Sequence, residues 1–224
     1  MQHILIAVPQ SNELQPLLSR RDRLGHPSQP IVIGNMPCYS LPSLGATAAV
    51  GGHGKTQFAV QCQYLIDRCD GLVALFCVGA AGSLSPDTHF GDVVVGEYTI
   101  EHDYKIRFEP AEPPRHVANE TLLNEFREAA IGLLPFRTHF GPIASGDEDI
   151  VDEVRARELR QFTGAKCVAW EGSGGARAAA FNGVPFLEIR CITDGADADA
   201  AASFRANCER VLPNIADLLV RWRL

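Results

Sequence analysis

The stretch that decides the fold is residues 169–197, "AWEGSGGARAAAFNGVPFLEIRCITDGAD". After a short apolar run it shows an alanine-rich helical pattern over 172–182, and then an apolar, β-branched run over 186–192. Strand, helix and strand in succession are typical of an α/β fold. Glu171 stands before the helix and Asp194 after the second strand, and ligands of open α/β sheets gather at the carboxyl ends of strands. The stretch therefore predicts both a fold class and a place for chemistry.

The same alternation extends outward over the chain. Further strands are predicted at 4–8, 31–33, 46–50, 72–78, 92–99 and 167–169. Further helices are predicted at 13–24, 55–69, 120–134, 147–162 and 201–223. The proline-rich run 104–119 is predicted as a long surface excursion, because strand and helix patterns continue on both sides of it. With 224 residues, the sequence predicts one α/β sandwich domain over 1–224.

Composition narrows the class of partner. The chain is 46% hydrophobic and 21% charged, as in an ordinary soluble globular protein. Its formal charge of −7 argues against a general nucleic-acid binder and favours a small-molecule partner. The start "MQHILIAVPQ" predicts a first strand, with neither a signal peptide nor a membrane span. Seven cysteines without a C-x-x-C pair fit buried thiols in a reducing cytoplasm, and no metal site is expected.

The run Gly51–Thr56, "GGHGKT", ends like a phosphate-binding loop and raises the question of an NTPase. The pattern G-x-x-x-x-G-K-[ST] needs a glycine at position 49, where this chain has alanine. Gly51 and Gly52 would make the loop too short to encircle a phosphate. We therefore interpret the run as a glycine-rich turn between a strand and a helix.

Three acids, Glu13, Glu171 and Asp194, stand at predicted strand ends, where an open sheet could bring them to one cleft. Burial after an apolar strand is expected to raise the pKa of Asp194, so that it carries a proton at neutral pH as a general acid does. The alternatives are that Asp194 caps the downstream helix and that Glu13 is a first-turn acid beside a helix dipole.

Glu171 lies between Trp170 and a Gly-Ser-Gly-Gly run. A carboxylate there can accept hydrogen bonds from two vicinal hydroxyls, as a ribose offers, while the glycines admit the sugar. The alternative is that the glycines serve tight helix packing. The turn Gly79-Ala80-Ala81-Gly82 is expected to form a loop that presents N–H groups to an anion or a water, although such turns are common for conformational reasons.

Together these segments resemble the nucleoside phosphorylase and nucleosidase superfamily, most closely its methylthioadenosine/S-adenosylhomocysteine nucleosidase and futalosine hydrolase branch. The motifs that carry the likeness span nearly the whole chain: "AVPQSNEL", "VGGHGKTQFAVQ", "VGAAGSLSPDTHFGDVVVGE", "EHDYKI", "IASGDEDI", the opening stretch and "SFRANCERVL". The resemblance implies a three-layer α/β/α sandwich with a central mixed, partly barrel-like sheet.

The resemblance also implies a mechanism for cleaving a purine-type nucleoside. Asp194 would protonate or hydrogen-bond N7 of the departing base, Glu171 would hold the ribose hydroxyls, and Glu13 would orient or deprotonate the attacking water. No metal or other cofactor is needed. Gly79 and Ala80 would lie near the water, and Asp149 with Ile150 near the base.

Hydrolysis is favoured over phosphorolysis because the first loop carries Glu13 and lacks arginine until Arg20, and the strand before Gly79 also lacks one. A nucleoside-binding relative with little turnover is a third interpretation, since Ala80, Asp149 and Trp170 depart from the usual residues. Asp149 replaces an aromatic ring, so a base other than adenine is possible. Trp170 narrows the space beside the sugar, so a long 5′ substituent is disfavoured or takes another route.

The resemblance further implies a homodimer with its sites near the interface. The segment "EHDYKIRF" would reach a neighbour's pocket, where Phe108 could cover the 5′ end of a substrate. The alternative is an exposed hairpin with ordinary charges. Phe204 could wall the same 5′ pocket, or equally be a core residue of its helix.

Overall fold

The computed structural model describes residues 3–109 and 111–223. Its strands are β1 (His3–Val8), β2 (Gln29–Ile33), β3 (Met36–Leu41), β4 (Ala46–Val50), β5 (Leu72–Ser83), β6 (Val93–Glu101), β7 (Arg115–Val117), β8 (Thr138–Ser145), β9 (Cys167–Ala169) and β10 (Phe186–Asp194). Its helices are α1 (Ser11–Arg23), α2 (Lys55–Ile66), α3 (Glu120–Ala129), α4 (Glu153–Thr163), α5 (Gly172–Phe181), α6 (Ala200–Val211) and α7 (Pro213–Arg223), with a short 3-10 turn, η1 (Pro42–Leu44).

All ten strands join one mixed sheet, and part of that sheet closes into a barrel. Strand β10 pairs in parallel with β5 and antiparallel with β6, while β6, β8, β9 and β5 pair in turn, so that these five strands form a ring. From β5 the sheet continues outward through β1, β4, β3 and β2. The predicted mixed, partly barrel-like sheet is confirmed.

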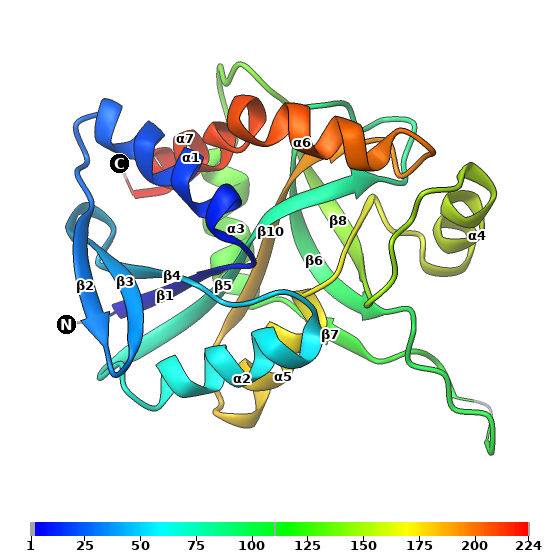
Figure 1. The fold of residues 1–224 in the computed structure, drawn as a ribbon, viewed down its shortest axis with the longest axis horizontal. Helices are drawn as coiled ribbons and strands as arrows, with labels where there is room; N and C mark the ends of the chain where they lie inside the picture. The colour runs from blue at the N-terminus through cyan, green and yellow to red at the C-terminus, as the bar shows by residue number, and fades with distance from the viewer. Residues whose placement is uncertain (1–2, 110, 224) are drawn as a thin grey trace.

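Helices cover both faces of this sheet, because alternate residues of its strands point in opposite directions. Ile4, Ile6 and Val8 of β1 belong to the apolar cluster that also holds residues of α1, α6 and α7. Leu5 and Ala7 belong to the cluster with residues of α2 and α5. Figure 1 shows these two groups of helices on opposite sides of the sheet. This is the predicted three-layer arrangement.

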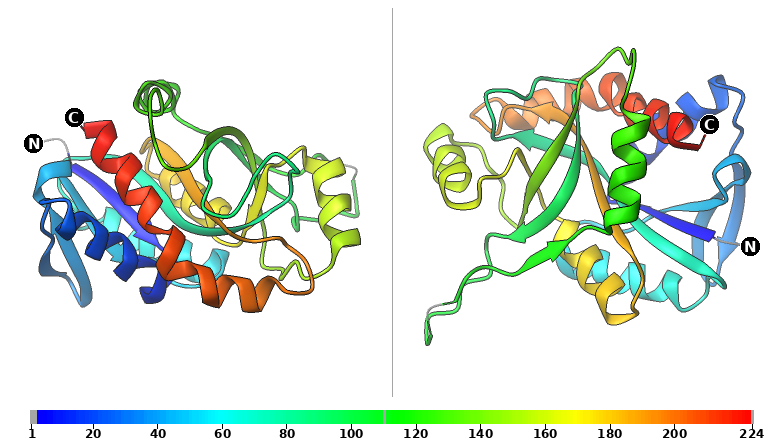
Figure 2. Two further views of the ribbon diagram at one scale, coloured as in Figure 1. Left: turned by 90° about the horizontal axis from the view of Figure 1, so that it is seen from above. Right: turned by 180° about the vertical axis from the view of Figure 1, so that it is seen from behind.

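The sequence prediction missed three strands, β3, β7 and β8. Strand β8 contains Gly141 and Pro142, which weaken its local strand pattern, yet it is held between β6 and β9. Strand β7 lies inside the predicted excursion 104–119 and pairs with β6. The described residues between β6 and β7, 102–109 and 111–114, run out from the body of the molecule, as two views show (Figure 1, Figure 2).

The predicted loop Gly79–Gly82 is wrong, because these residues lie inside β5. Residues 79–82 pair with β10, and Gly82 also pairs with Val168 of β9, so partners on both sides extend the strand beyond its apolar part.

The predicted helices 55–69 and 120–134 end earlier, at Ile66 and Ala129, and two others differ for clear local reasons. The predicted helix 201–223 is two helices, since Pro213 lacks the N–H that a continuing helix needs. The predicted helix 147–162 begins at Glu153, where the Asp152 carboxylate caps it by accepting from the N–H groups of Val154 and Arg155. The residues before this cap form a loop, and residues 148–151 of it line a cavity. In the described part of the chain, no helix is long and apolar enough to cross a membrane.

Gly174 tests the packing of α5 on α2. A Cβ atom placed there would collide with the backbone oxygen of Lys55, so Gly174→Ala must push the two helices apart. We expect a loss of about 1–3 kcal/mol of unfolding free energy, or about 2–4 °C of Tm for each kcal/mol. Thermal unfolding measures it, with exposed Ala180→Ser on the same helix as the control. Equal Tm values for the two variants would contradict this packing.

Candidate active site

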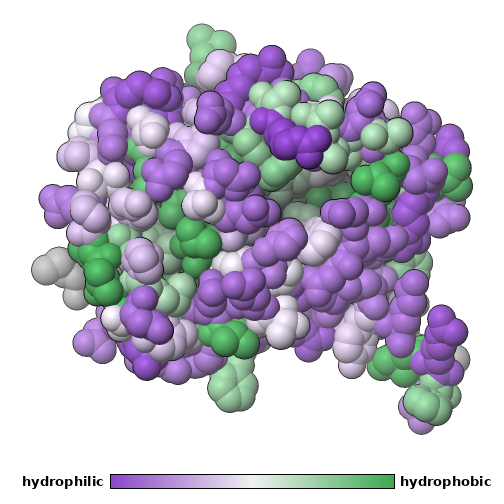
Figure 3. Space-filling model, in the orientation of Figure 1, coloured by the Kyte–Doolittle hydropathy of each residue, from purple (hydrophilic) through white to green (hydrophobic). Residues whose placement is uncertain are grey.

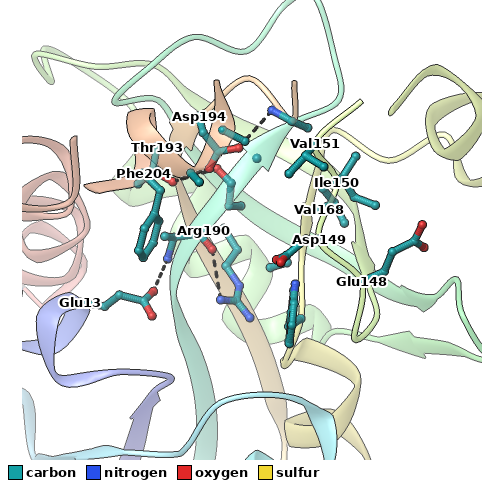
Figure 4. A pocket seen from close by; sticks show the side chains of 18 of the residues that line it. Glu13, Glu148, Asp149, Ile150, Val151, Val168, Arg190, Thr193, Asp194 and Phe204 are labelled. Carbon is teal, nitrogen blue, oxygen red and sulfur yellow. Dashed lines mark hydrogen bonds between the residues drawn. The ribbon is translucent and has the colours of Figure 1, made fainter. Parts of the chain in front are cut away.

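A cavity of about 280 Å³ lies where β5, β9 and β10 end, between the start of α1, the loop before α4, and α6. The hollow has apolar residues on its floor and hydrophilic residues around its rim (Figure 3). Eight of the ten residues proposed from the sequence line it: Glu13, Ala80, Asp149, Ile150, Trp170, Glu171, Asp194 and Phe204. Figure 4 shows Glu13 and Phe204 on one side of it and Asp149 with Ile150 on the other.

The other two proposed residues lie elsewhere. Gly79 is buried behind the cavity wall, where an added Cβ would lie 2.5 Å from Oε2 of Glu13. Phe108 is fully exposed in the segment between β6 and β7, and it does not line this cavity in the described part of the chain. Its contact with a neighbour's substrate stays a prediction.

Glu13 projects from the first turn of α1 and is buried. Its Oε2 accepts a hydrogen bond of 2.7 Å from the N–H of Ala80. Burial, aided by the charge of Glu171, raises the pKa of Glu13 to about 8, against the opposing effect of the Ala80 N–H. The residue is therefore a first-turn acid, as the alternative held, and also a cavity acid with strong affinity for a proton.

Asp194 is the last residue of β10, and it does not cap α6. Its two oxygens accept from the N–H of Ala196, at 3.0 Å, and from the hydroxyl of Thr193, at 2.9 Å. Burial raises the pKa of Asp194 above its usual value, although both hydrogen bonds oppose the shift. The expected raised pKa is thus found, and its cause is the expected one.

Glu171 is the N-cap residue just before α5, and it lies next to the buried Arg190. Oε1 of Glu171 accepts from the N–H of Gly54 at 3.2 Å, and Oε2 is 3.5 Å from both terminal nitrogens of Arg190. Arg190 also donates at 2.8 Å to Glu188, which is equally buried. Glu171 is therefore held from two sides by donors, with its carboxylate at the cavity.

The glycine-rich turn uses its N–H groups on the protein's own acids. Besides the bond from Gly54, the N–H of Lys55 donates to Asp147 at 2.8 Å. The ammonium group of Lys55 lies 3.0 Å from Glu101 and is also bonded to Asp103. The turn therefore has the structural role that the sequence suggested.

Sequence reasoning missed Arg190, Thr193 and His53, which also line the cavity. A signal for Arg190 was present, since Glu188 and Arg190 are charged residues spaced by two within an apolar strand, and therefore share one face. Nothing local marked His53, which enters the site through the turn at 51–54. Within residues 3–109 and 111–223, no group of three His, Cys, Asp or Glu side chains is arranged to hold a metal ion.

A closed mixed barrel with an acid-lined cavity at its strand ends defines an α/β enzyme with a site of small-molecule size. The sequence model of the phosphorylase superfamily matches residues 3–222, and the chain belongs to that superfamily.

Relatives define the branch. The 5′-methylthioadenosine/S-adenosylhomocysteine nucleosidase of Treponema pallidum is 33% identical over 218 residues, which cover 82% of this chain and 80% of that protein. The enzyme of the same name from an Exiguobacterium species is 30% identical, with 84% and 80% covered. The futalosine hydrolase structure from Helicobacter pylori superposes with a TM-score of 0.85 at 25% identity, over 99% of this chain and 97% of that one. The chain lies among the nucleosidases, which hydrolyse N-glycosidic bonds, and the resemblance seen in the sequence is confirmed.

The raised pKa of Glu13 can be tested through the pH dependence of the protein's stability. A carboxyl group with a pKa of about 8 in the folded state and 4.5 in the unfolded chain costs stability as pH rises between these values. Glu13→Gln keeps an acceptor for Ala80 and removes the titration. The variant should match the wild type near pH 4 and exceed it at pH 8 by up to about 4 kcal/mol. Unfolding measured across this range checks the sign, and a stability difference that does not change with pH would contradict the assigned shift.

Proposed function

We propose that the protein hydrolyses the N-glycosidic bond of a purine-type nucleoside, such as methylthioadenosine, futalosine or a related compound, to free base and sugar. The observation that carries this proposal is that three buried acids, Glu13, Glu171 and Asp194, line one cavity. Two of them, Glu13 and Asp194, have raised pKa values. Groups that hold and accept protons are what cleavage of a glycosidic bond requires.

We assign to Asp194 the role of the general acid that helps the base to leave. With its pKa raised by burial, Asp194 can present a proton to N7 of the purine as the glycosidic bond breaks. Thr193 and the N–H of Ala196 hold its carboxyl group in place. Asp149 and Ile150 lie across the cavity, where they are assigned to the base (Figure 4). The exposed Asp149 can accept a hydrogen bond from an amino or ring N–H group.

We assign binding of the sugar to Glu171 and activation of the attacking water to Glu13. Glu171 accepts hydrogen bonds from the ribose hydroxyls while Arg190 and Gly54 hold it. As the sugar becomes an oxocarbenium-like cation, its positive charge favours ionised Glu13. A carboxylate whose pKa is about 8 is a strong base for taking a proton from the attacking water. Ala80 fixes that carboxylate through its N–H.

The charge of the cavity supports hydrolysis over phosphorolysis. Five acidic residues line it, Glu13, Glu148, Asp149, Glu171 and Asp194, and those of them that are ionised would repel a phosphate. Of the described arginines, Arg190 and Arg205 line the cavity, and Arg190 is already engaged by Glu188 and Glu171. A site for phosphate would need arginines turned to the ligand.

We also infer the organisation around the site. Residues 1–224 act as one domain, as the single sheet supports. Seven free cysteines, of which six are buried, fit the reducing cytoplasm. Two copies form a homodimer with sites near the interface, because α2, β7 and α5 expose the large apolar residues Val60, Val117 and Phe181.

Base release from a nucleoside panel tests the activity. Purified protein with methylthioadenosine, adenosine, inosine and futalosine should release free base without phosphate. Glu13→Gln and Asp194→Asn should each lower kcat by about 10²–10⁴-fold, since each removes a proton-transfer group. Glu158→Gln, exposed on α4, is the matched control and should be unaffected. Release that requires phosphate would make the protein a phosphorylase, and binding without release would make it a nucleoside-binding relative.

Analytical ultracentrifugation, which measures the mass of the protein in solution, tests the proposed homodimer. The protein should have about twice the 24.3 kDa mass of the chain. Phe181→Glu should dissociate it, because a charge would then be buried in an apolar contact. Leu133→Glu, an equally exposed apolar residue in the segment between α3 and β8, should leave the mass unchanged. A wild-type protein that sediments as a monomer would contradict the dimer and leave the activity test untouched.

A further inference from the structure

Two charged side chains, Glu188 and Arg190, form an ion pair inside the apolar strand β10. Both residues are 1% exposed, and Nε of Arg190 donates to Oε1 of Glu188 at 2.8 Å. Burial takes both charges out of water, which costs free energy that an apolar pair of the same size would not cost. Of these two described residues, Arg190 lines the cavity and Glu188 does not. Glu188 is therefore a buried charge directly behind the site.

The surrounding elements hold the Glu188 carboxylate in one position. Its Oε2 accepts from the hydroxyl of Thr99, a buried residue of β6. Gly172, the first residue of α5, lies so close that a Cβ atom there would collide with the carboxylate. The carboxylate thus lies against the N-terminal end of α5, where the helix dipole favours a negative charge. Glu188 is therefore a fixed acceptor for Arg190.

Arg190 connects this fixed acceptor to the acids of the cavity. Both terminal nitrogens of Arg190 lie 3.5 Å from Oε2 of Glu171, and Nη1 donates to the carbonyl of Ala80 at 3.3 Å. The N–H of the same Ala80 donates to Glu13 at 2.7 Å. One guanidinium group therefore joins Glu188 to Glu171 directly, and to Glu13 through a single backbone unit.

We propose that Glu188 is a positioning residue for the reaction, which acts through Arg190 on the acids assigned to the sugar and the water. The inference rests on the proposed function, because it takes Glu171 and Glu13 in those two roles. As an acceptor, Glu188 keeps the guanidinium group turned toward Glu171. As a charge, it offsets part of the positive charge of Arg190, which favours the ionised form of Glu13.

Four other titratable groups near Glu188 or Glu13 come from the neighbouring elements. They are three thiols and one imidazole: Cys77 of β5, Cys167 of β9, Cys208 of α6 and His116 of β7. Burial raises the pKa of each thiol and lowers the pKa of the imidazole, so all four are neutral at pH 8. The charged groups that act on Glu13 are Glu171 and Arg190. Removal of the Glu188 charge is therefore felt at Glu13 through Arg190.

Glu188→Gln tests the effect of the charge. Glutamine keeps the size of the side chain and an acceptor for Arg190, but Glu13 should then lose its proton at lower pH. Because catalysis needs ionised Glu13, kcat/KM rises with pH, and this rising limb should move about 1 pH unit toward acid. The ratio of kcat/KM at pH 6 to kcat/KM at pH 9 should rise by about tenfold.

Glu188→Asp tests the effect of the position. Aspartate keeps the charge but is one methylene shorter, so it cannot reach both Thr99 and Arg190. Its kcat/KM should fall by about 10- to 100-fold at every pH, with the rising limb left in place. Asp217→Asn is the matched control, since it removes the carboxylate of another arginine pair, with Arg20, that does not line the cavity. This control should keep the wild-type kcat/KM and limb.

A measurement without substrate separates this inference from the proposed function. NMR of protein labelled with ¹³C at its glutamate carboxyl groups follows Glu13, whose signal is identified by its loss in Glu13→Gln. The titration midpoint of Glu13 should be lower in Glu188→Gln than in the wild type, whether or not a nucleoside is cleaved.

Each outcome decides the matter. A limb and a midpoint that stay in place in Glu188→Gln, or a wild-type kcat/KM in Glu188→Asp, overturn the inference while the nucleosidase function stands. An equal loss of kcat/KM at every pH in both variants indicates a structural role alone and also overturns it. If no nucleoside loses its base but the midpoint moves, the proposed function falls and the coupling of Glu188 to Glu13 stands. If Glu188→Gln does not fold, Glu188→Asp decides: a lower kcat/KM at wild-type Tm supports the inference.

Discussion

The pairing of β5 with β10 is the constraint on which the rest of the structure depends. It closes the ring of strands, and its register sets Gly79 beside Arg190 and Gly82 beside Asp194. Because the two strands are parallel, their carboxyl ends meet at one edge, and the cavity forms at that edge. Glu171 reaches the same place through β9, which pairs with the end of β5. Glu13, which precedes Glu171 and Asp194 by more than a hundred residues, thus lines the same cavity as they do.

Glycines leave the space that the carboxyl groups of buried acids occupy in and around the cavity wall. A Cβ on Gly79 would lie 2.5 Å from the Glu13 carboxylate, one on Gly82 would lie 2.7 Å from that of Asp194, and one on Gly172 would collide with that of Glu188. Each glycine therefore provides the room that a buried carboxylate occupies. Such burial costs stability, as the raised pKa of Glu13 shows. A cost of this kind is typical of a functional site, where local stability is lost in exchange for reactivity.

Local patterns predicted much of the fold, because apolar periodicity over β1, β4 and α2 reflects burial directly. They failed where pairing at long range decides the structure. Gly79–Gly82 has no strand pattern of its own, and it becomes strand because β9 and β10 flank it. Strand β8, which contains a glycine and a proline, likewise lacks a clear strand pattern and forms a strand because β6 and β9 flank it. The three acids could be singled out because they follow apolar runs, whereas His53 reaches the cavity only through the tertiary position of its turn.

The turn at 51–55 shows why a phosphate-like motif serves a different chemistry here. A glycine turn before a helix presents N–H groups to anions, which is the physics of phosphate binding. In this chain the anions are the protein's own carboxylates, Glu171 on Gly54 and Asp147 on Lys55. The turn therefore fixes a negative charge at the cavity instead of attracting one from solution. A carboxylate fixed at the cavity suits hydroxyl donors and a developing cation, so the same local geometry fits the proposed cleavage of a nucleoside and not that of a triphosphate.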